Sequence, residues 1–202
     1  MQRVPHKPRQ TSKNYEKCIL ITICFAIYSC TCKQVNLTKN EKEWLNPYKK
    51  GDILIFKSNL GSIDTVKVID KTEFITNENC QWLTIGDTQN QCINIDLKPN
   101  ICHNKFYCKG EVSIIKSNVD DETAPFFRIF GLEFSKNVDR LIKRKVVLST
   151  TGKVYKSAYL FQDKINADNS GNNYMKTFFW DKIDGLIKYE SNDGEIFEVT
   201  NR

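Results

Sequence analysis

The sequence predicts a mostly β protein: a single antiparallel β-rich domain, built as a meander, a sandwich or a half-barrel, with one or two short helices. Short runs of β-branched and aromatic residues recur from Gly51 onward, separated by Asn, Asp, Gly and Ser. These runs follow one another too closely for the helical crossovers that parallel strands require. The length that remains after the N-terminal segment, about 170 residues without repeats or Pro/Gly-rich linkers, is typical of one domain.

One or two short helices are expected. Thr38 and Glu41 have the spacing of a capping box, in which each side chain satisfies a backbone donor at a helix start. The helix then covers about 39–45 and ends before Pro47, because proline disfavours helical geometry in the preceding residue. A second helix is predicted from residues at helical spacing behind a potential cap at Ser135, namely Phe134, Val138, Leu141 and Ile142.

The predicted strands fall into two sets along the chain. The first set is 53–56, 65–69, 73–76, 81–85, 91–95 and 112–115, and the second is 126–130, 146–148, 156–161, 176–180, 186–190 and 195–200. The last two are expected to form a hairpin through Ser191, Asn192, Asp193 and Gly194, because Gly194 supplies the positive φ that a tight turn requires.

The N-terminus has the order of a secretory signal. Five basic residues and one acidic residue precede an apolar segment, 18–28, which is too short for the roughly 20 residues that a membrane span requires. Ile27-Tyr28-Ser29-Cys30 resembles a lipobox, so residues 1–29 are expected to be a lipoprotein signal peptide and Cys30 the lipidated residue. Cys32 is the fallback, and a cleaved secreted protein or an uncleaved interfacial anchor are the alternatives.

Residues 30–37 are expected to form a tether, and residues 38–202 the β-rich domain. Five of the 30 basic residues and one of the 24 acidic residues precede Cys30, so removal of the signal lowers the net charge from +6 to +2. A chain this close to neutrality, without a run of five like charges, does not indicate a nucleic-acid partner. The cluster Lys143-Arg144-Lys145 is interpreted as a solvated face.

Three parts of the sequence resemble the small uncharacterised lipoproteins of Bacteroidetes cell envelopes. They are the signal ending at Ser29-Cys30, the segment 48–65, and a C-terminal pattern formed by Gly152-Lys153-Val154-Tyr155, Phe179-Trp180-Asp181-Lys182 and 185–189. The resemblance implies lipid anchoring in the cell envelope and no particular activity. Acidic residues, which can direct such proteins to the cell surface, are missing after Cys30. The expected location is therefore the periplasmic face of the outer membrane.

Four cysteines remain after the lipobox, and in an oxidising compartment an even number predicts two disulfides. Three connectivities are possible for Cys80, Cys92, Cys102 and Cys108. A hairpin of 81–85 with 91–95 would place Cys80 opposite Cys92 and favours 80–92 with 102–108. The alternative, a zinc site with His103, has no Cys-x-x-Cys pair to support it, and we expect no metal and no cofactor.

The composition argues against an enzyme that uses histidine. His103 is the only histidine after the signal, and no nucleophile elbow or glycine-rich phosphate loop is present. The expected function is therefore non-enzymatic binding or a structural role in the envelope. The alternative is a hydrolase that acts on envelope glycans through paired carboxylates, whose separation depends on the fold.

Adjacent aromatic residues on a strand indicate either that helices or loops cover both faces of the sheet, or that one face has an apolar groove for a lipid, a peptide or a glycan. Neighbouring side chains of a strand point to opposite faces of the sheet, so pairs of adjacent rings place at least one ring away from the core. The candidate apolar ligand surface consists of Phe126, Phe127, Phe130, Phe178, Phe179 and Trp180. The expected partners are the membrane, through the N-terminal lipid, and an envelope protein or an apolar ligand.

Overall fold

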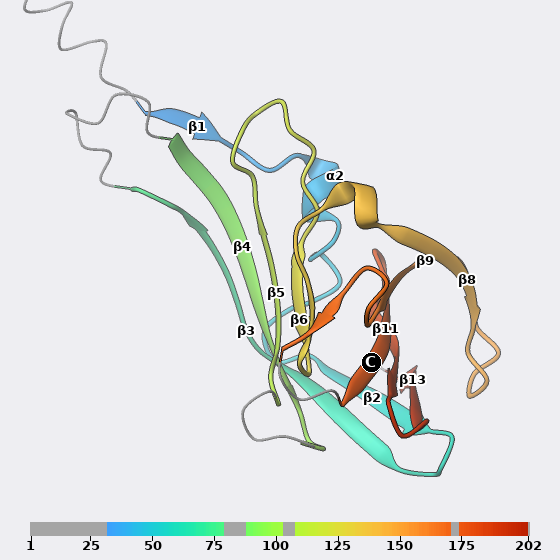
Figure 1. Ribbon diagram of the computed structural model, residues 1–202. Helices are drawn as coiled ribbons and strands as arrows, with labels where there is room; N and C mark the ends of the chain where they lie inside the picture. The colour runs from blue at the N-terminus through green and yellow to red at the C-terminus, as the bar shows by residue number, and fades with distance from the viewer. Residues whose placement is uncertain (1–31, 79–87, 103–107, 171–173, 202) are drawn as a thin grey trace, which may run out of the picture.

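The computed structural model describes residues 32–78, 88–102, 108–170 and 174–201. They form one 13-stranded sheet that curls into a half-barrel (Figure 1). Paired strands run antiparallel, except that β1 is parallel to β4. The predicted fold class is confirmed. Of the three predicted architectures, the structure has the half-barrel.

The sheet is largely a meander. In chain order the elements are β1 (Lys33–Val35), α2 (Lys39–Lys42), β2 (Ile53–Ser58), β3 (Ile63–Ile75), β4 (Thr88–Pro99), β5 (Gly110–Ile115), β6 (Phe126–Ile129), β7 (Leu132–Phe134), the 3-10 helix η1 (Val138–Arg140), β8 (Ile142–Val147), β9 (Val154–Gln162), β10 (Asp168–Asn169), β11 (Met175–Asp181), β12 (Gly185–Ser191) and β13 (Ile196–Asn201). The strand order is β10-β7-β6-β5-β4-β3-β2-β13-β12-β11-β9-β8, so β10 and β8 form the two margins.

An aromatic core fills the concave face of the sheet. Phe127 is fully buried, and its ring centroid lies 4.7–6.4 Å from those of five other rings, those of Trp44, Phe134, Phe161, Phe178 and Trp180. Such offset and edge contacts add to the free energy gained by burying apolar area. The interior of the half-barrel is therefore occupied by side chains.

The segment that contains α2 completes this core. The capping box of Thr38 and Glu41 is confirmed, although the helix ends at Lys42. Beyond it, the carbonyl of Trp44 accepts a hydrogen bond from the Trp180 indole at 3.2 Å. The hydroxyl of Tyr48 accepts one from the Leu186 amide at 2.7 Å. These bonds hold the segment against β11 and β12.

The second predicted helix is wrong. Phe134 is buried at the end of β7, Val138 begins the single 3-10 turn η1, and Ile142 begins β8. The turn is capped by Asn137, whose side chain accepts the Asp139 amide at 2.9 Å, and not by Ser135. Pairing of Ile142 with Leu160 in β9 keeps the chain extended there, so the helical spacing does not become a helix.

Three other expectations are corrected or fall outside the described residues. The predicted strands 65–69 and 73–76 are one strand, β3, with a register shift between Val68 and Asp70. The expected tether contains β1, which pairs with β4 and buries Val35. The predicted strand 81–85, the signal peptide and Cys30 lie outside the described residues. In the part of the chain that is described, no helix is both long enough and apolar enough to cross a membrane.

Candidate binding groove on the outer face

The structure separates the six aromatic residues that were predicted to form an apolar ligand surface. Phe127, Phe178 and Trp180 are 0% exposed and Phe130 is 7% exposed, so these four belong to the core and present no surface to a ligand. Phe126 and Phe179 are only partly buried. Strand alternation explains the split, because each lies beside a ring that points inward. The expectation of a ring outside the core is met at these two positions.

Strand register places Phe179 at the centre of an outer-face patch. It pairs with Leu160 of β9 and Lys188 of β12. Directly opposed residues share a face of the sheet, so all three side chains lie together. Two residues earlier in β11, Thr177 forms a second row on this face.

Beside this patch, residues 144–147 of β8 form the side of an open groove, which we call the outer groove. Its volume is about 410 Å³. Leu160, Thr177 and Phe179 form its floor. Leu160 and Thr177 are buried, so the part of the floor that a ligand can touch is largely the Phe179 ring.

The outer groove carries an excess of positive charge. Four cationic residues line it, namely Arg144, Lys145, Lys176 and Lys188, whereas Glu190 is the single acidic residue among the described lining residues. Lys176 pairs with Glu190 at 2.8 Å, and Lys188 pairs with Glu198 behind the groove, also at 2.8 Å.

The other two cations are available to a partner. The Arg144 guanidinium donates a 3.4 Å hydrogen bond to the Lys143 carbonyl, and no carboxylate of the described residues pairs with it. Lys145 makes no ion pair or hydrogen bond with the described residues. An acidic group that enters the groove therefore meets positive charge that no described carboxylate neutralises.

The β8–β9 hairpin that frames the groove is anchored by Glu198. One carboxylate oxygen of Glu198 accepts the Ser149 hydroxyl at 2.8 Å and the Thr150 amide at 3.0 Å. The other accepts Lys188 at 2.8 Å. Burial alone would raise the pKa of Glu198, but the hydrogen bonds from Lys188, Ser149 and Thr150 outweigh it and lower the pKa. The carboxylate is therefore charged at neutral pH and fixes the hairpin.

A small second core lies behind the same hairpin. It consists of Val146, Leu148, Tyr155, Ala158 and Ile187, with Phe179 packed against it. The groove wall is thus held by apolar packing as well as by Glu198. A wall fixed before binding reduces the entropy lost when a partner is ordered on it.

A more enclosed cavity of about 400 Å³ lies beside the hairpin, between β2, β13 and the β11–β12 turn. At its rim, Asp184 pairs with Lys153 and accepts the Tyr155 hydroxyl at 2.8 Å. Burial, together with the bond to Asp184, raises the pKa of Tyr155 to about 12, so the hydroxyl stays protonated. Lys153 and Asp184 neutralise each other, and this cavity lacks the charge excess of the outer groove.

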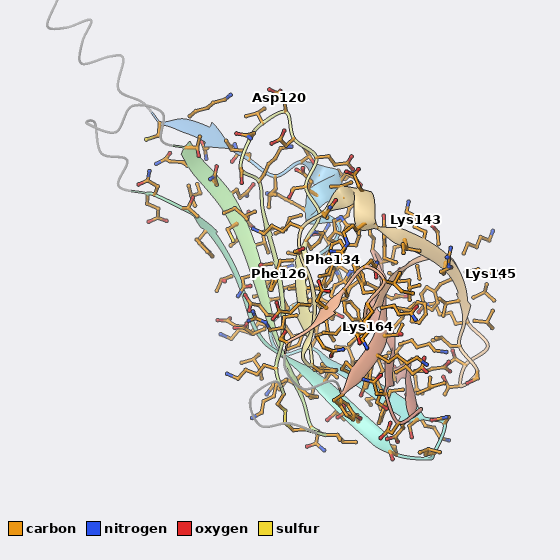
Figure 2. All side chains as sticks on the ribbon, viewed as in Figure 1. Asp120, Phe126, Phe134, Lys143, Lys145 and Lys164 are labelled. Atoms are coloured by element: carbon orange, nitrogen blue, oxygen red, sulfur yellow. A yellow bond between two sulfur atoms is a disulfide. The ribbon has the colours of Figure 1, made fainter. Side chains whose placement is uncertain are left out.

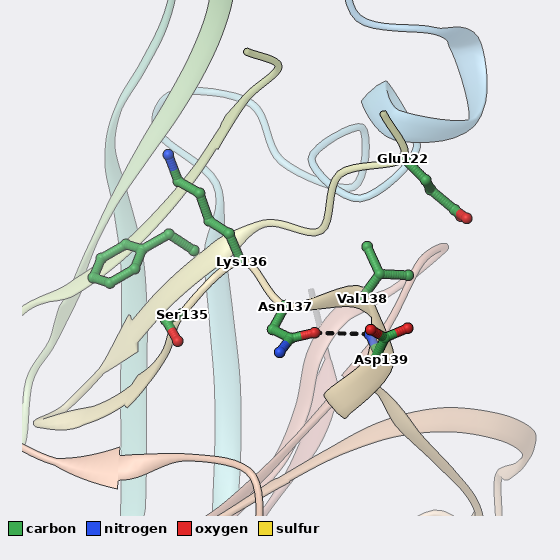
Figure 3. Close-up of a pocket in the computed structure, with 7 residues that line it drawn as sticks. Glu122, Ser135, Lys136, Asn137, Val138 and Asp139 are labelled. Atoms are coloured by element: carbon green, nitrogen blue, oxygen red, sulfur yellow. Dashed lines mark hydrogen bonds between the residues drawn. The ribbon is translucent and has the colours of Figure 1, made fainter. Parts of the chain in front are cut away.

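A third depression contains Phe126 and two carboxylates. It is open, with a volume of about 750 Å³, and Figure 3 shows Glu122 and Asp139 entering it from different segments. Lys136 is its one described cationic lining residue. Both carboxylates are exposed, whereas a glycosidase general acid usually lies against an apolar wall that excludes water.

The buried carboxylates elsewhere are occupied by their own partners. Glu41 is paired with Lys116 at 3.0 Å, and both side chains are nearly inaccessible. Asp64 accepts the amides of Asn100 and Ile101 at 3.0 and 2.9 Å and the Tyr189 hydroxyl at 2.7 Å. These carboxylates hold the core and the loops together and do not face the three depressions.

The cysteine pairing is corrected in part. Cys102 and Cys108 form the expected disulfide, with a Cα–Cα distance of 5.2 Å. Cys92 is a free, buried thiol, so the expected bond to Cys80 is absent. Cys92 lies in the interior of the sheet, between Phe74 of β3 and Ile115 of β5. Burial raises the pKa of the Cys92 thiol.

Cys32 is also disulfide-bonded, although the sequence analysis considered it only as a fallback for lipidation. Its sulfur is therefore unavailable for a thioether to lipid while the bond persists. Cys80 and His103 lie outside the described residues. Within the described ranges, no three His, Cys, Asp or Glu side chains converge as metal ligands do.

No local sequence pattern identifies the outer groove. Residues 143–145 have the pattern of a solvated face, and Lys176 and Lys188 carry no sequence signal of a binding role. Their placement around Phe179 follows from the pairing of β11 with β9 and β12, which no local pattern specifies. No protein-family model, no curated protein and no solved structure matches this chain.

Proposed function

We propose that this chain is a non-enzymatic binding protein of the cell envelope, anchored by a lipid on Cys30, that binds an acidic partner in the outer groove. The observation that supports binding is the cationic edge strand beside the half-buried Phe179 ring, with Arg144 on the face of that ring and Lys145 next to it in β8. Cations around an apolar floor attract acidic groups and give the attached side chains a surface to pack on. The anchor and the periplasmic location rest on the lipobox and on the lipoprotein resemblance.

The hydrolase alternative depends on Glu122 and Asp139. They are the described carboxylates that line one depression together, but both are exposed, and the side chain of Lys136, its one described cation, points away from them (Figure 3). Binding is preferred because the outer groove combines charge, an aromatic floor and a fixed wall. A hydrolase would lose activity in Glu122→Gln, whereas this change leaves partner binding intact in our proposal.

Charge reversal in the groove tests the proposal. The full-length protein, in a neutral detergent, is titrated with poly-L-glutamate at low salt. We expect Arg144→Glu combined with Lys145→Glu to weaken binding at least tenfold, about 1.4 kcal/mol. The control, Lys67→Glu with Lys98→Glu, makes the same charge change on exposed residues of β3 and β4 and should stay within threefold of the wild type. Equal losses in both variants would show that only net charge matters and would contradict a groove site.

A further inference from the structure

We infer that the acidic partner is an extended polypeptide segment that adds a strand to the open edge of β8; this inference rests on the proposed function and names the class of its partner. Strand addition requires a regular edge with unpaired backbone groups and places for the alternating side chains of the added strand. The geometry of β8 meets both requirements.

The open edge follows from the strand order. β8 ends the sheet and, among the described residues, pairs with β9 alone. Figure 1 shows it at the right-hand margin, with no described element covering its outer side. The β8–β9 pair contains a register shift between Arg144 and Val146, but the extra residue lies on β9, where Lys156 and Ser157 oppose Lys145. The backbone of β8 is therefore regular and can pair with a further strand.

Cations flank this edge on both faces of the sheet. Register places Arg144 beside Ala158 on the outer face, next to the outer groove. Lys143 lies on the opposite face, 5.2 Å from the centroid of the Tyr159 ring. Lys145 shares that face by strand alternation, and Figure 2 shows Lys143 and Lys145 at the margin of the molecule. Acidic side chains on either face of an added strand would thus lie opposite a cation.

The same charges exclude other occupants. A second copy of the chain paired through β8 would bring two Lys-Arg-Lys segments together, and like charges directly opposite each other are destabilising. Lysines on an edge strand also discourage pairing with uncharged strands. With an acidic segment, the electrostatic interaction with β8 becomes attractive, and the backbone hydrogen bonds of the added strand form as well. Its outer-face side chains reach the floor formed by Phe179 and Leu160.

Backbone methylation of a peptide tests strand addition. Three nine-residue peptides that alternate Glu and Val, with identical charge, are titrated into the full-length protein: one unmodified, one N-methylated at every second amide and one N-methylated throughout. The second keeps one edge able to pair, and the third has none. We expect the first two to bind within about threefold of each other and the third to bind at least tenfold more weakly. Arg144→Glu with Lys145→Glu should weaken the first two.

The outcomes separate this inference from the proposed function. Equal binding of all three peptides, still lost in the Arg144→Glu and Lys145→Glu variant, would overturn strand addition and leave the proposed binding of an acidic partner in the outer groove standing. Binding of poly-L-glutamate without binding of the unmodified peptide would do the same. Failure of both probes to bind would overturn the proposed function together with the inference.

Discussion

Gly185 occupies the tightest backbone position at the start of β12. Its φ is +73°, and a Cβ at this position would overlap the Tyr48 hydroxyl that accepts the Leu186 amide. A non-glycine residue in the left-handed region costs about 1–2 kcal/mol, and overpacking a fixed ring costs about 1–3 kcal/mol more. The residue therefore permits the contact between β12 and the segment that follows α2.

We expect Gly185→Ala to lower the free energy of unfolding by about 2–5 kcal/mol, because it adds both costs. Gly194→Ala is the matched control, since Gly194 has a φ of +90° but nothing within 4 Å of an added Cβ. It should lose only about 1–2 kcal/mol. Urea unfolding of both variants measures the difference. Equal losses of unfolding free energy would show that overlap with Tyr48 does not contribute to the cost.

For single residues, the sequence predicts the face of the sheet to which a strand side chain points. It does not predict which residue of a neighbouring strand lies opposite. The opposite orientations of Phe126 and Phe127 follow from strand geometry alone. The free thiol of Cys92 does not, because its neighbour is set by the pairing of β4 with β3. The sequence around Lys145 does not indicate a binding role either, since an exposed lysine in a basic cluster is ordinarily a solvated residue.

The β8–β9 hairpin is the element on which the outer groove depends. Glu198 holds its turn through Ser149 and Thr150. The pKa of Glu198 is lowered from its ordinary value of 4.5, so the carboxylate stabilises the folded protein above that pH. The stabilisation disappears as the pH falls through the lower pKa of the folded state.

We expect Glu198→Gln to reduce stability by about 2 kcal/mol near neutral pH, since it weakens charge-assisted hydrogen bonds to a buried group. The deficit should shrink as the pH falls below about 4.5 and the wild-type carboxylate becomes protonated. Glu190→Gln removes a more exposed ion pair with Lys176 and should cost at most about 1 kcal/mol. Thermal unfolding followed across this pH range measures both, and a deficit independent of pH would contradict the role of the charge.

Elements that depend on near neighbours were predictable, and those that depend on distant pairing were not. The capping box at Thr38 and the β12–β13 hairpin with Gly194 are confirmed because a few consecutive residues specify them. The predicted helix behind Ser135 failed because the pairing of β8 with β9 overrides helical spacing. Neither β1 nor β10 was expected, since each is short and finds its partner far along the chain.

For the whole molecule, the fold class followed from the spacing of strands and turns, whereas the curl of the sheet and its two open margins follow from the strand order. The meander joins β2 to β7, and β13 pairs with β2 to bring the C-terminal strands into the same sheet. Four of the six predicted ligand-surface rings therefore became the core. The outer groove forms only after this assembly.

We expect Cys30→Ala to abolish lipid attachment and leave the precursor unprocessed by the lipoprotein route, since in the proposed anchor the Cys30 thiol accepts the lipid. Labelling with a fatty-acid analogue in cells measures it. Cys18→Ala, which changes a cysteine of the expected signal peptide, is the control and should keep the label. Undiminished labelling of Cys30→Ala would overturn the anchoring assignment and leave the groove proposal unaffected.

The most direct test of the binding account compares the two outward rings. The unmodified Glu-Val peptide is titrated into Phe179→Ala and Phe126→Ala, and thermal unfolding confirms that both variants are folded. The account predicts that Phe179→Ala weakens binding at least fivefold, because the ring forms the exposed floor of the outer groove, and that Phe126→Ala binds as the wild type does. Weakened binding in Phe126→Ala with unchanged binding in Phe179→Ala would contradict the account and place the site in the depression of Glu122 and Asp139.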